Sequence, residues 1–162
     1  MTVRRIIAPV TFAEDSLEAT VVAAELAVAL GAELVLLGIA PLVRPELTDA
    51  PDDAGALPRS VQQQRLVDRI LGDRLRELSA SLPSPVRRRT LLTYGPVGAA
   101  LVDAAEEHHA DLVVVPMRRE NGLAHVLHDH ADRYLLHHSG VPVLVVPTHG
   151  SDPRHEPRAE AA

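Results

Sequence analysis

The sequence contains no cysteine and no lysine, so all its basic side chains other than histidine are arginine. Without cysteine there can be no disulfide, no thiol nucleophile and no zinc site built from thiolates. Without lysine there can be no Walker-type phosphate loop, no Schiff base and no anchor for pyridoxal phosphate. These two absences exclude several common classes of enzyme.

Aromatic side chains are also scarce, being limited to Phe12, Tyr94 and Tyr134. The core must therefore be built from alanine, valine, leucine and isoleucine, and few rings are left on which single-stranded nucleic acid could stack. The formal net charge of -6 does not attract duplex DNA. No apolar run is long enough to cross a bilayer or to form a signal peptide. We therefore expect a cytoplasmic protein that binds neither nucleic acid nor membranes.

The order of apolar and polar segments indicates one globular α/β domain. The chain has 162 residues, 46% of them hydrophobic and 23% charged, which suits a single core. Strand-like runs alternate with helix-like runs from end to end. The expected strands span residues 4–10, 33–40, 86–94, 111–116 and 141–147, and the expected helices span 15–30, 62–82, 96–109 and 129–138. This alternation predicts a doubly wound, flavodoxin/Rossmann-like fold, in which a five-stranded parallel sheet has helices on both faces.

Charged residues place one of these strands at an edge of the sheet. The third expected strand contains Arg87, Arg88 and Arg89, which a central strand could not bury. After their first one or two residues, the first, second and fourth expected strands are apolar throughout. We therefore expect those three to be central.

The first expected helix carries a start signal and an apolar face. Asp15 and Glu18 are spaced like a capping box. Apolar residues that recur at the helical spacing share one face, and they are Leu17, Val21, Ala24 and Val28. The pattern is typical of a helix that packs on a sheet.

Two segments lack the spaced apolar residues that a packed structure needs. Residues 41–58 are dense in proline and acidic residues, which predicts a mobile loop. Residues 148–162 are polar and contain proline, which predicts a disordered tail. The folded domain is therefore expected to span residues 1–147.

Four stretches of the sequence resemble the universal stress protein (UspA-like) family. They read RRIIAPVTFAEDSLEA, AVALGAELVLLGIA, GPVGAALVDAAEEHHADLVVVPMR and HSGVPVLVVP, and the similarity covers roughly residues 3–147. The resemblance implies an adenine nucleotide alpha hydrolase-like fold with strand order 3-2-1-4-5. It also implies a homodimeric protein of the stress response that acts by binding and regulation rather than by turnover, so we expect no catalytic residue.

Many members of that family bind ATP at the carboxyl ends of the first and fourth strands, and here the motif for doing so is degenerate. Thr11 stands where the family usually has an aspartate. After the fourth strand only Gly122 remains of the family's glycines, and His128 and Asp129 stand where a glycine followed by serine or threonine is expected. A side chain at a glycine position that needs a positive φ costs about 1 kcal/mol or more. The charge of Asp129 also opposes a phosphate.

The same cleft remains a candidate nucleotide site, because ligands of doubly wound folds bind at the carboxyl ends of the strands. Arg118 and Arg119 could pair with phosphate. The candidate contacts are Pro9, Val10, Thr11, Ile39, Ala40, Met117, Arg118, Gly122, His128 and Asp129. The cofactor that the sequence suggests is ATP or another adenine nucleotide.

Two alternatives stay open for this cleft. The protein could be a switch that responds to an adenine nucleotide. It could also be a weak nucleotide hydrolase, whose catalytic groups would then be Thr11, His128 and Asp129. A further glycine-containing segment, GPVG at residues 95–98, is explained better as a turn than as a phosphate loop.

Histidines gather after the fourth expected strand. His125 and His128 would share one face of a helix and are candidate ligands for zinc or nickel, whereas His130 would point elsewhere. A solvated loop and helix start explains these residues better, so we expect no metal site. The pairs at 108–109 and 137–138 lie near expected helix C-termini, where the helix dipole favours positive charge.

The last expected strand predicts a contact between two copies of the chain. In the order 3-2-1-4-5 this strand lies at a sheet edge, yet it has none of the charge that protects exposed edges. Its apolar residues are Val141, Val143, Leu144, Val145 and Val146. The family resemblance implies that the strand pairs antiparallel with its twin across a two-fold axis. The sequence names no other protein partner.

Overall fold

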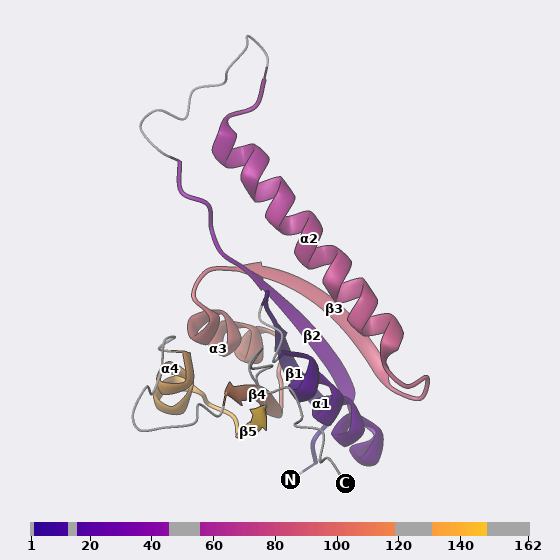
Figure 1. The fold of residues 1–162 in the computed structure, drawn as a ribbon. Helices are drawn as coiled ribbons and strands as arrows, with labels where there is room; N and C mark the ends of the chain where they lie inside the picture. The colour runs from indigo at the N-terminus through magenta and orange to yellow at the C-terminus, as the bar shows by residue number, and fades with distance from the viewer. Residues whose placement is uncertain (1, 13–15, 46–55, 119–130, 149–162) are drawn as a thin grey trace, which may run out of the picture.

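The computed structural model describes residues 2–12, 16–45, 56–118 and 131–148, which form five strands and four helices (Figure 1). The strands are β1 (Arg5–Val10), β2 (Glu33–Ala40), β3 (Arg87–Tyr94), β4 (Leu112–Arg118) and β5 (Val143–Thr148). The helices are α1 (Ser16–Leu30), α2 (Arg59–Ser81), α3 (Val97–Glu107) and α4 (Ala131–His138). Strands and helices alternate along the described chain, as the sequence predicts.

All five strands form one parallel sheet in the order β3-β2-β1-β4-β5, so the predicted sheet and its strand order are confirmed. The arginine-rich strand β3 lies at an edge, as expected. Arg87 and Arg89 are exposed there, and Arg88 is half-buried. The guanidinium of Arg88 donates a hydrogen bond to the carbonyl oxygen of Pro83 at 3.1 Å. The edge position thus keeps the three charges in contact with water or with backbone oxygens.

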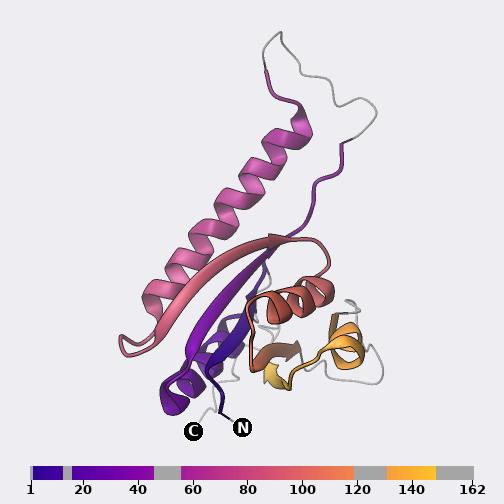
Figure 2. The same ribbon diagram turned by 180° about the vertical axis from the view of Figure 1, so that it is seen from behind.

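Side chains alternate between the two faces of the sheet and form an apolar layer on each. The helices α1 and α2 cover the face that carries Ile6 and Leu34, whereas α3 and α4 cover the face that carries Ile7 and Val35 (Figures 1 and 2). In the described part of the chain, every buried hydrophobic residue is alanine, valine, leucine or isoleucine. The core is therefore built without aromatic rings, as the composition requires.

The helix α1 packs on the sheet with a different face from the one that its larger apolar residues predict. Leu17, Val21 and Val28 are 47%, 43% and 43% exposed. The buried residues are small ones, namely Ser16, Ala19, Thr20, Ala23, Ala24 and Ala27. Small side chains let the helix approach the bulky strand residues beneath it closely, since packing depends on fitted volume rather than on hydrophobicity alone.

The helix α2 extends beyond the sheet at its amino end, as both views of the ribbon show (Figures 1 and 2). Its carboxyl-terminal half packs on the sheet through Leu71, Leu75 and Leu78. A Cβ at Gly38 of β2 would lie 2.6 Å from Leu75 Cδ1, so this glycine allows the helix to approach the strand. In the projecting half, Leu66 is 55% exposed. The helix begins at Arg59, directly after Pro58 at the N-cap, which is earlier than the predicted start at residue 62.

The pairing between β1 and β4 is short. It joins Ile6 to Leu112 and Ile7 to Val113, whereas β4 and β5 are paired from Val113 to Arg118. Pro9 in β1 and Pro116 in β4 have no N–H to donate to a neighbouring strand. The two central strands therefore separate toward their carboxyl ends, at the point where the strand order reverses.

Several predictions concern residues outside the described ranges. The proposed mobile loop lies largely in 46–55 and the proposed tail largely in 149–162, so both stay predictions. Two described parts of these segments are held in place. Thr148 is the last residue of β5 and is fully buried, and residues 41–43 are hydrogen-bonded to α2. Within the described ranges, no helix combines the length and apolar character that a membrane crossing requires.

Candidate functional site

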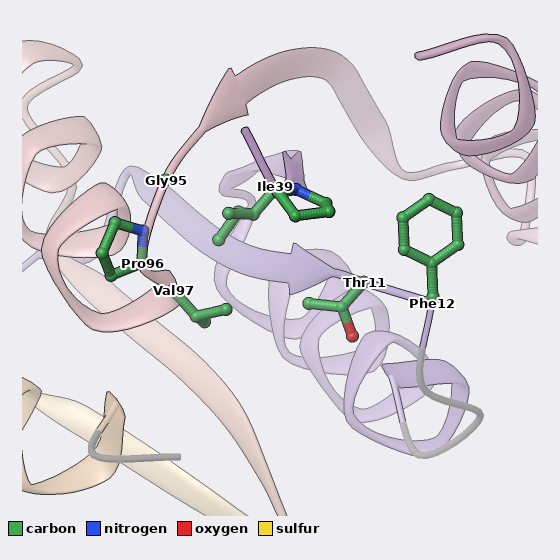
Figure 3. Close-up of a pocket in the computed structure, with 7 residues that line it drawn as sticks. Thr11, Phe12, Ile39, Gly95, Pro96 and Val97 are labelled. Carbon is green, nitrogen blue, oxygen red and sulfur yellow. The ribbon is translucent and has the colours of Figure 1, made fainter. Parts of the chain in front are cut away.

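An open cleft lies at the carboxyl ends of β1, β2 and β3, where the sheet meets the beginning of α3 (Figure 3). Its volume is about 360 Å³. The residues that line it are Thr11, Phe12, Ile39, Pro41, Gly95, Pro96 and Val97. Ligands of doubly wound folds bind at this end of the sheet, so the cleft is the candidate functional site.

The walls of the cleft are the segments that directly follow the strands. Phe12 is the second residue after β1, and Pro41 is the first after β2. Gly95 follows β3 with a φ of +111°, which glycine adopts without strain, and its N–H donates to the carbonyl oxygen of Ala40 at 3.1 Å. Pro96 is then the N-cap of α3. This turn brings the positive end of the α3 dipole to the cleft.

Thr11 contributes the one side-chain hydroxyl of the lining. Its Oγ1 lies 3.3 Å from the Oγ of Ser16 at the beginning of α1, and its backbone N–H donates to the same Oγ at 3.3 Å. In Figure 3 the methyl group of Thr11 points toward Val97 and the hydroxyl points away from it. Because the lining contains no charged side chain, the cleft suits a flat and largely apolar ring.

A polar contact outside the cleft joins the end of β3 to α2. The hydroxyl of Tyr94 donates a hydrogen bond to Asp68 Oδ2 at 3.2 Å. Partial burial of the phenol, together with the charge of Asp68 and this hydrogen bond, raises the pKa of Tyr94 above its ordinary value of 10.0. Tyr94 therefore remains a hydrogen-bond donor throughout the neutral pH range.

The structure brings two of the predicted nucleotide contacts, Thr11 and Ile39, together in the cleft. Pro9, Val10 and Ala40 are buried, and the side chains of Val10 and Ala40 belong to the apolar layer beneath α1 and α2, on the opposite face of the sheet from Ile39. Val10 and Ala40 therefore pack beneath the strand ends and do not line the cleft.

The other predicted contacts belong to β4 or follow it. Met117 is 43% exposed near the carboxyl end of β4 and does not line the cleft. Arg118 is the last residue of that strand. The remaining candidates, Gly122, His128 and Asp129, lie outside the described residues, as does the metal candidate His125. Of the three groups that a hydrolase would need, the described part of the chain thus contains only Thr11.

The sequence interpretation missed the residues that form most of the cleft, namely Phe12, Pro41, Gly95, Pro96 and Val97. Of the GPVG segment, Gly95 and Pro96 form the predicted turn, whereas Val97 and Gly98 already belong to α3, and its first three residues line the cleft. One signal could have found them. Every loop that follows a strand of a parallel sheet ends at the same edge, so the residues after the first three strands are all candidates.

The family model that describes the universal stress protein family matches residues 2–147 of the chain. This match covers all of the described residues except Thr148. No curated protein sequence matches the chain.

Solved structures share the fold at low sequence identity. The protein MJ0577 is 15% identical with a TM-score of 0.70, and the alignment covers 93% of this chain and 100% of that one. A universal stress protein in complex with cAMP is 23% identical with a TM-score of 0.56, covering 93% and 100%. The universal stress protein from Archaeoglobus fulgidus in complex with dAMP is 14% identical with a TM-score of 0.52, covering 90% and 98%. At these identities the likeness establishes the fold alone.

Proposed function

The chain belongs to the universal stress protein family, and we propose that it is a regulatory protein that binds an adenine nucleoside or nucleotide in the cleft between Thr11 and Val97. It acts in the cytoplasm, in the response to stress, and by binding rather than by turnover. It works as a homodimer that is joined through β5.

The observation that carries this proposal is the lining of the cleft. Phe12 is 42% exposed and offers an aromatic surface, while Ile39 and Val97 lie across from it in Figure 3. Apolar walls of this kind bind a flat ring by stacking and by exclusion of water. The beginning of α3 adds a positive partial charge at the same place, which favours a ligand that carries a phosphate.

A ligand with one phosphate fits the chain better than a triphosphate. The glycines with which many family members hold ATP are replaced after β4, and Asp129 adds a negative charge there. Two structural neighbours were solved with cAMP and with dAMP, each of which has a single phosphate. These ligands support AMP and cAMP as the first compounds to test here.

The proposed dimer rests on the position of β5. This strand is the last of the sheet and pairs with β4 alone among the described strands. Leu144 is 37% exposed, and Val143 and Val145 are half-buried. An apolar and uncharged edge of this kind is normally covered by another strand, and a second copy of β5 would cover it symmetrically.

Isothermal titration calorimetry with AMP, cAMP and Mg-ATP tests the ligand. We expect AMP or cAMP to bind at micromolar concentration and ATP to bind no more tightly. Phe12→Ala should weaken binding by about tenfold or more, because stacking of a base on an aromatic ring is worth about 1–3 kcal/mol.

Leu42→Ala is the matched control, since Leu42 is 63% exposed close to the cleft but does not line it. The Leu42→Ala variant should bind the nucleotides with the same affinity as the unmodified protein. Failure of all three nucleotides to bind would reject the proposed ligand, as would a Phe12→Ala variant that binds unchanged.

A further inference from the structure

One wall of the cleft is held from outside by the helix α2. Pro41 lines the cleft and begins the segment that leaves β2. In the described part of the chain, two hydrogen bonds fix this segment, and both are made by Gln64 of α2. Its Oε1 accepts the N–H of Val43 at 2.8 Å, and its Nε2 donates to the carbonyl oxygen of Pro41 at 3.3 Å.

Gln64 is itself fixed by a second contact within α2. Its Nε2 also donates to Asp68 Oδ1 at 3.0 Å, while Asp68 Oδ2 accepts the hydroxyl of Tyr94 at 3.2 Å. The amide therefore uses both of its donors and its acceptor oxygen, which leaves it one orientation. The same bonds connect Pro41, after β2, to Tyr94, which directly precedes the cleft residue Gly95.

We propose that Gln64 is a positioning residue for the ligand of this cleft. It holds the wall at Pro41 in place, and it links occupancy of the cleft to Asp68 and Tyr94. The inference rests on the proposed function, because it assumes that the cleft binds a nucleotide. Gln64 does not line the cleft and acts through Pro41.

The physical basis is preorganisation of the binding site. With Gln64 in place, the segment at 41–43 is ordered before the ligand arrives, so binding does not have to order it. Without the amide, part of the binding free energy is used to order that wall. Linkage is reciprocal, so if the order of the Pro41 wall favours the ligand, the bound ligand in turn favours the hydrogen bonds that run from Pro41 through Gln64 and Asp68 to Tyr94.

The chain offers a matched control for Gln64→Leu. Gln62 is on the same helix, and its Nε2 donates to the carbonyl oxygen of Leu57 at 2.7 Å, away from the cleft lining. Gln62→Leu therefore removes a similar side-chain hydrogen bond without touching Pro41. With AMP or cAMP as the probe in calorimetry, we expect Gln64→Leu to weaken binding by about five- to tenfold and Gln62→Leu by less than about twofold.

A spectroscopic signal separates positioning from a general effect on folding. The chain has no tryptophan and two tyrosines, so Tyr134→Phe leaves Tyr94 as the one tyrosine. NMR of ring-labelled tyrosine in this background should show the Tyr94 signal shift when AMP or cAMP binds. The shift should be retained in Gln62→Leu and largely lost in Gln64→Leu.

The outcomes distinguish this inference from the proposed function. If the unmodified protein binds neither AMP nor cAMP, the proposed function fails and the inference falls with it. If it binds but both glutamine variants bind equally well, or both are weakened equally, the inference alone is overturned. A Tyr94 signal that responds to ligand equally in Gln64→Leu would also overturn it.

Discussion

At the scale of single residues, two helices end in the same way but with different side chains. After α1, the N–H of Gly31 donates to the carbonyl oxygen of Val28 at 3.2 Å, and the N–H of Ala32 donates to the carbonyl oxygen of Ala27 at 2.8 Å. After α3, the N–H of His109 donates to Glu106 at 3.2 Å. The N–H of Ala110 donates to Ala105 at 2.9 Å, which completes the same Schellman pattern. Gly31 has a φ of +65°, and His109 must adopt a φ of +50°.

This comparison predicts that His109→Gly stabilises the protein. A side chain in the left-handed region costs about 1 kcal/mol, and glycine removes that cost. His109 is exposed, so its removal leaves no cavity. The midpoint temperature of thermal unfolding should rise by about 2–4 °C, the shift expected for about 1 kcal/mol in a chain of this length.

Gly31→Ala is the converse experiment. A Cβ at Gly31 would meet no atom within 4 Å, so the substitution tests the backbone conformation without a steric clash. We expect a loss of stability of about 1 kcal/mol. If both substitutions left the unfolding temperature unchanged, strain at these helix ends would be negligible.

At the scale of elements, strands were easier to predict from the sequence than helix faces. Buried strands are uninterrupted apolar runs, which is why β2 has the predicted bounds. Both sides of α1 are apolar, so its periodicity offered little contrast, and Leu17 and Val21 were placed on the side that the sheet contacts. Tight packing selected the alanine side instead.

The strand β5 carries the prediction for oligomerisation. Leu144→Arg puts a charge on the exposed edge, and in an isologous dimer this charge occurs twice. We expect light scattering at micromolar concentration to show a monomer for this variant and a dimer for the unmodified protein. Because Leu144 is 37% exposed, the folded monomer should tolerate the substitution better than it would at the buried Val146.

Leu136→Arg is the matched control for that experiment. Leu136 is 71% exposed on α4, a helix that packs with α3 on one face of the sheet and is not part of its edge, so the same substitution there should leave the dimer intact. A soluble monomer for the unmodified protein would reject the predicted interface, as would dimers that persist in Leu144→Arg.

At the scale of the whole molecule, we expect Tyr94 to make the stability of the fold depend on pH in the alkaline range. Its pKa is ordinary in the unfolded chain and raised in the folded one, so above about pH 10 the unfolded chain releases the proton first. The contribution is complete below the unfolded pKa and is lost as pH rises through the folded pKa. The free energy of unfolding in urea should therefore fall as the pH rises past the ordinary tyrosine pKa of about 10.

Tyr94→Phe should remove the contribution of Tyr94 to the alkaline fall in the free energy of unfolding, while Tyr134→Phe should retain it. An equal alkaline decline in the unmodified protein and in Tyr94→Phe would mean that the Asp68 contact does not influence global stability.

The fold could be predicted from local signals, but most of the cleft could not. Thr11 and Ile39 were found because each lies at the end of an apolar strand. Pro96 and Val97 reach the cleft because β3 lies beside β2 in the sheet. The predicted strand order implied this, but the segment was interpreted from its local pattern alone. Their segment GPVG looks like any turn, and only its place in the fold makes it part of a site.

The short pairing of β1 with β4 divides the backbone hydrogen bonding of the sheet into two panels. One panel is β3-β2-β1 and the other is β4-β5, and the registered pairs that join them are Ile6 with Leu112 and Ile7 with Val113. Each ladder hydrogen bond contributes about 0.5–1.5 kcal/mol. Twisting one panel against the other beyond Ile7 breaks no registered pair of β1 with β4. Of the described strand pairs this one has the fewest registered residues, so beyond Ile7 the two panels are joined mainly by α1, which contacts β1, β4 and β5.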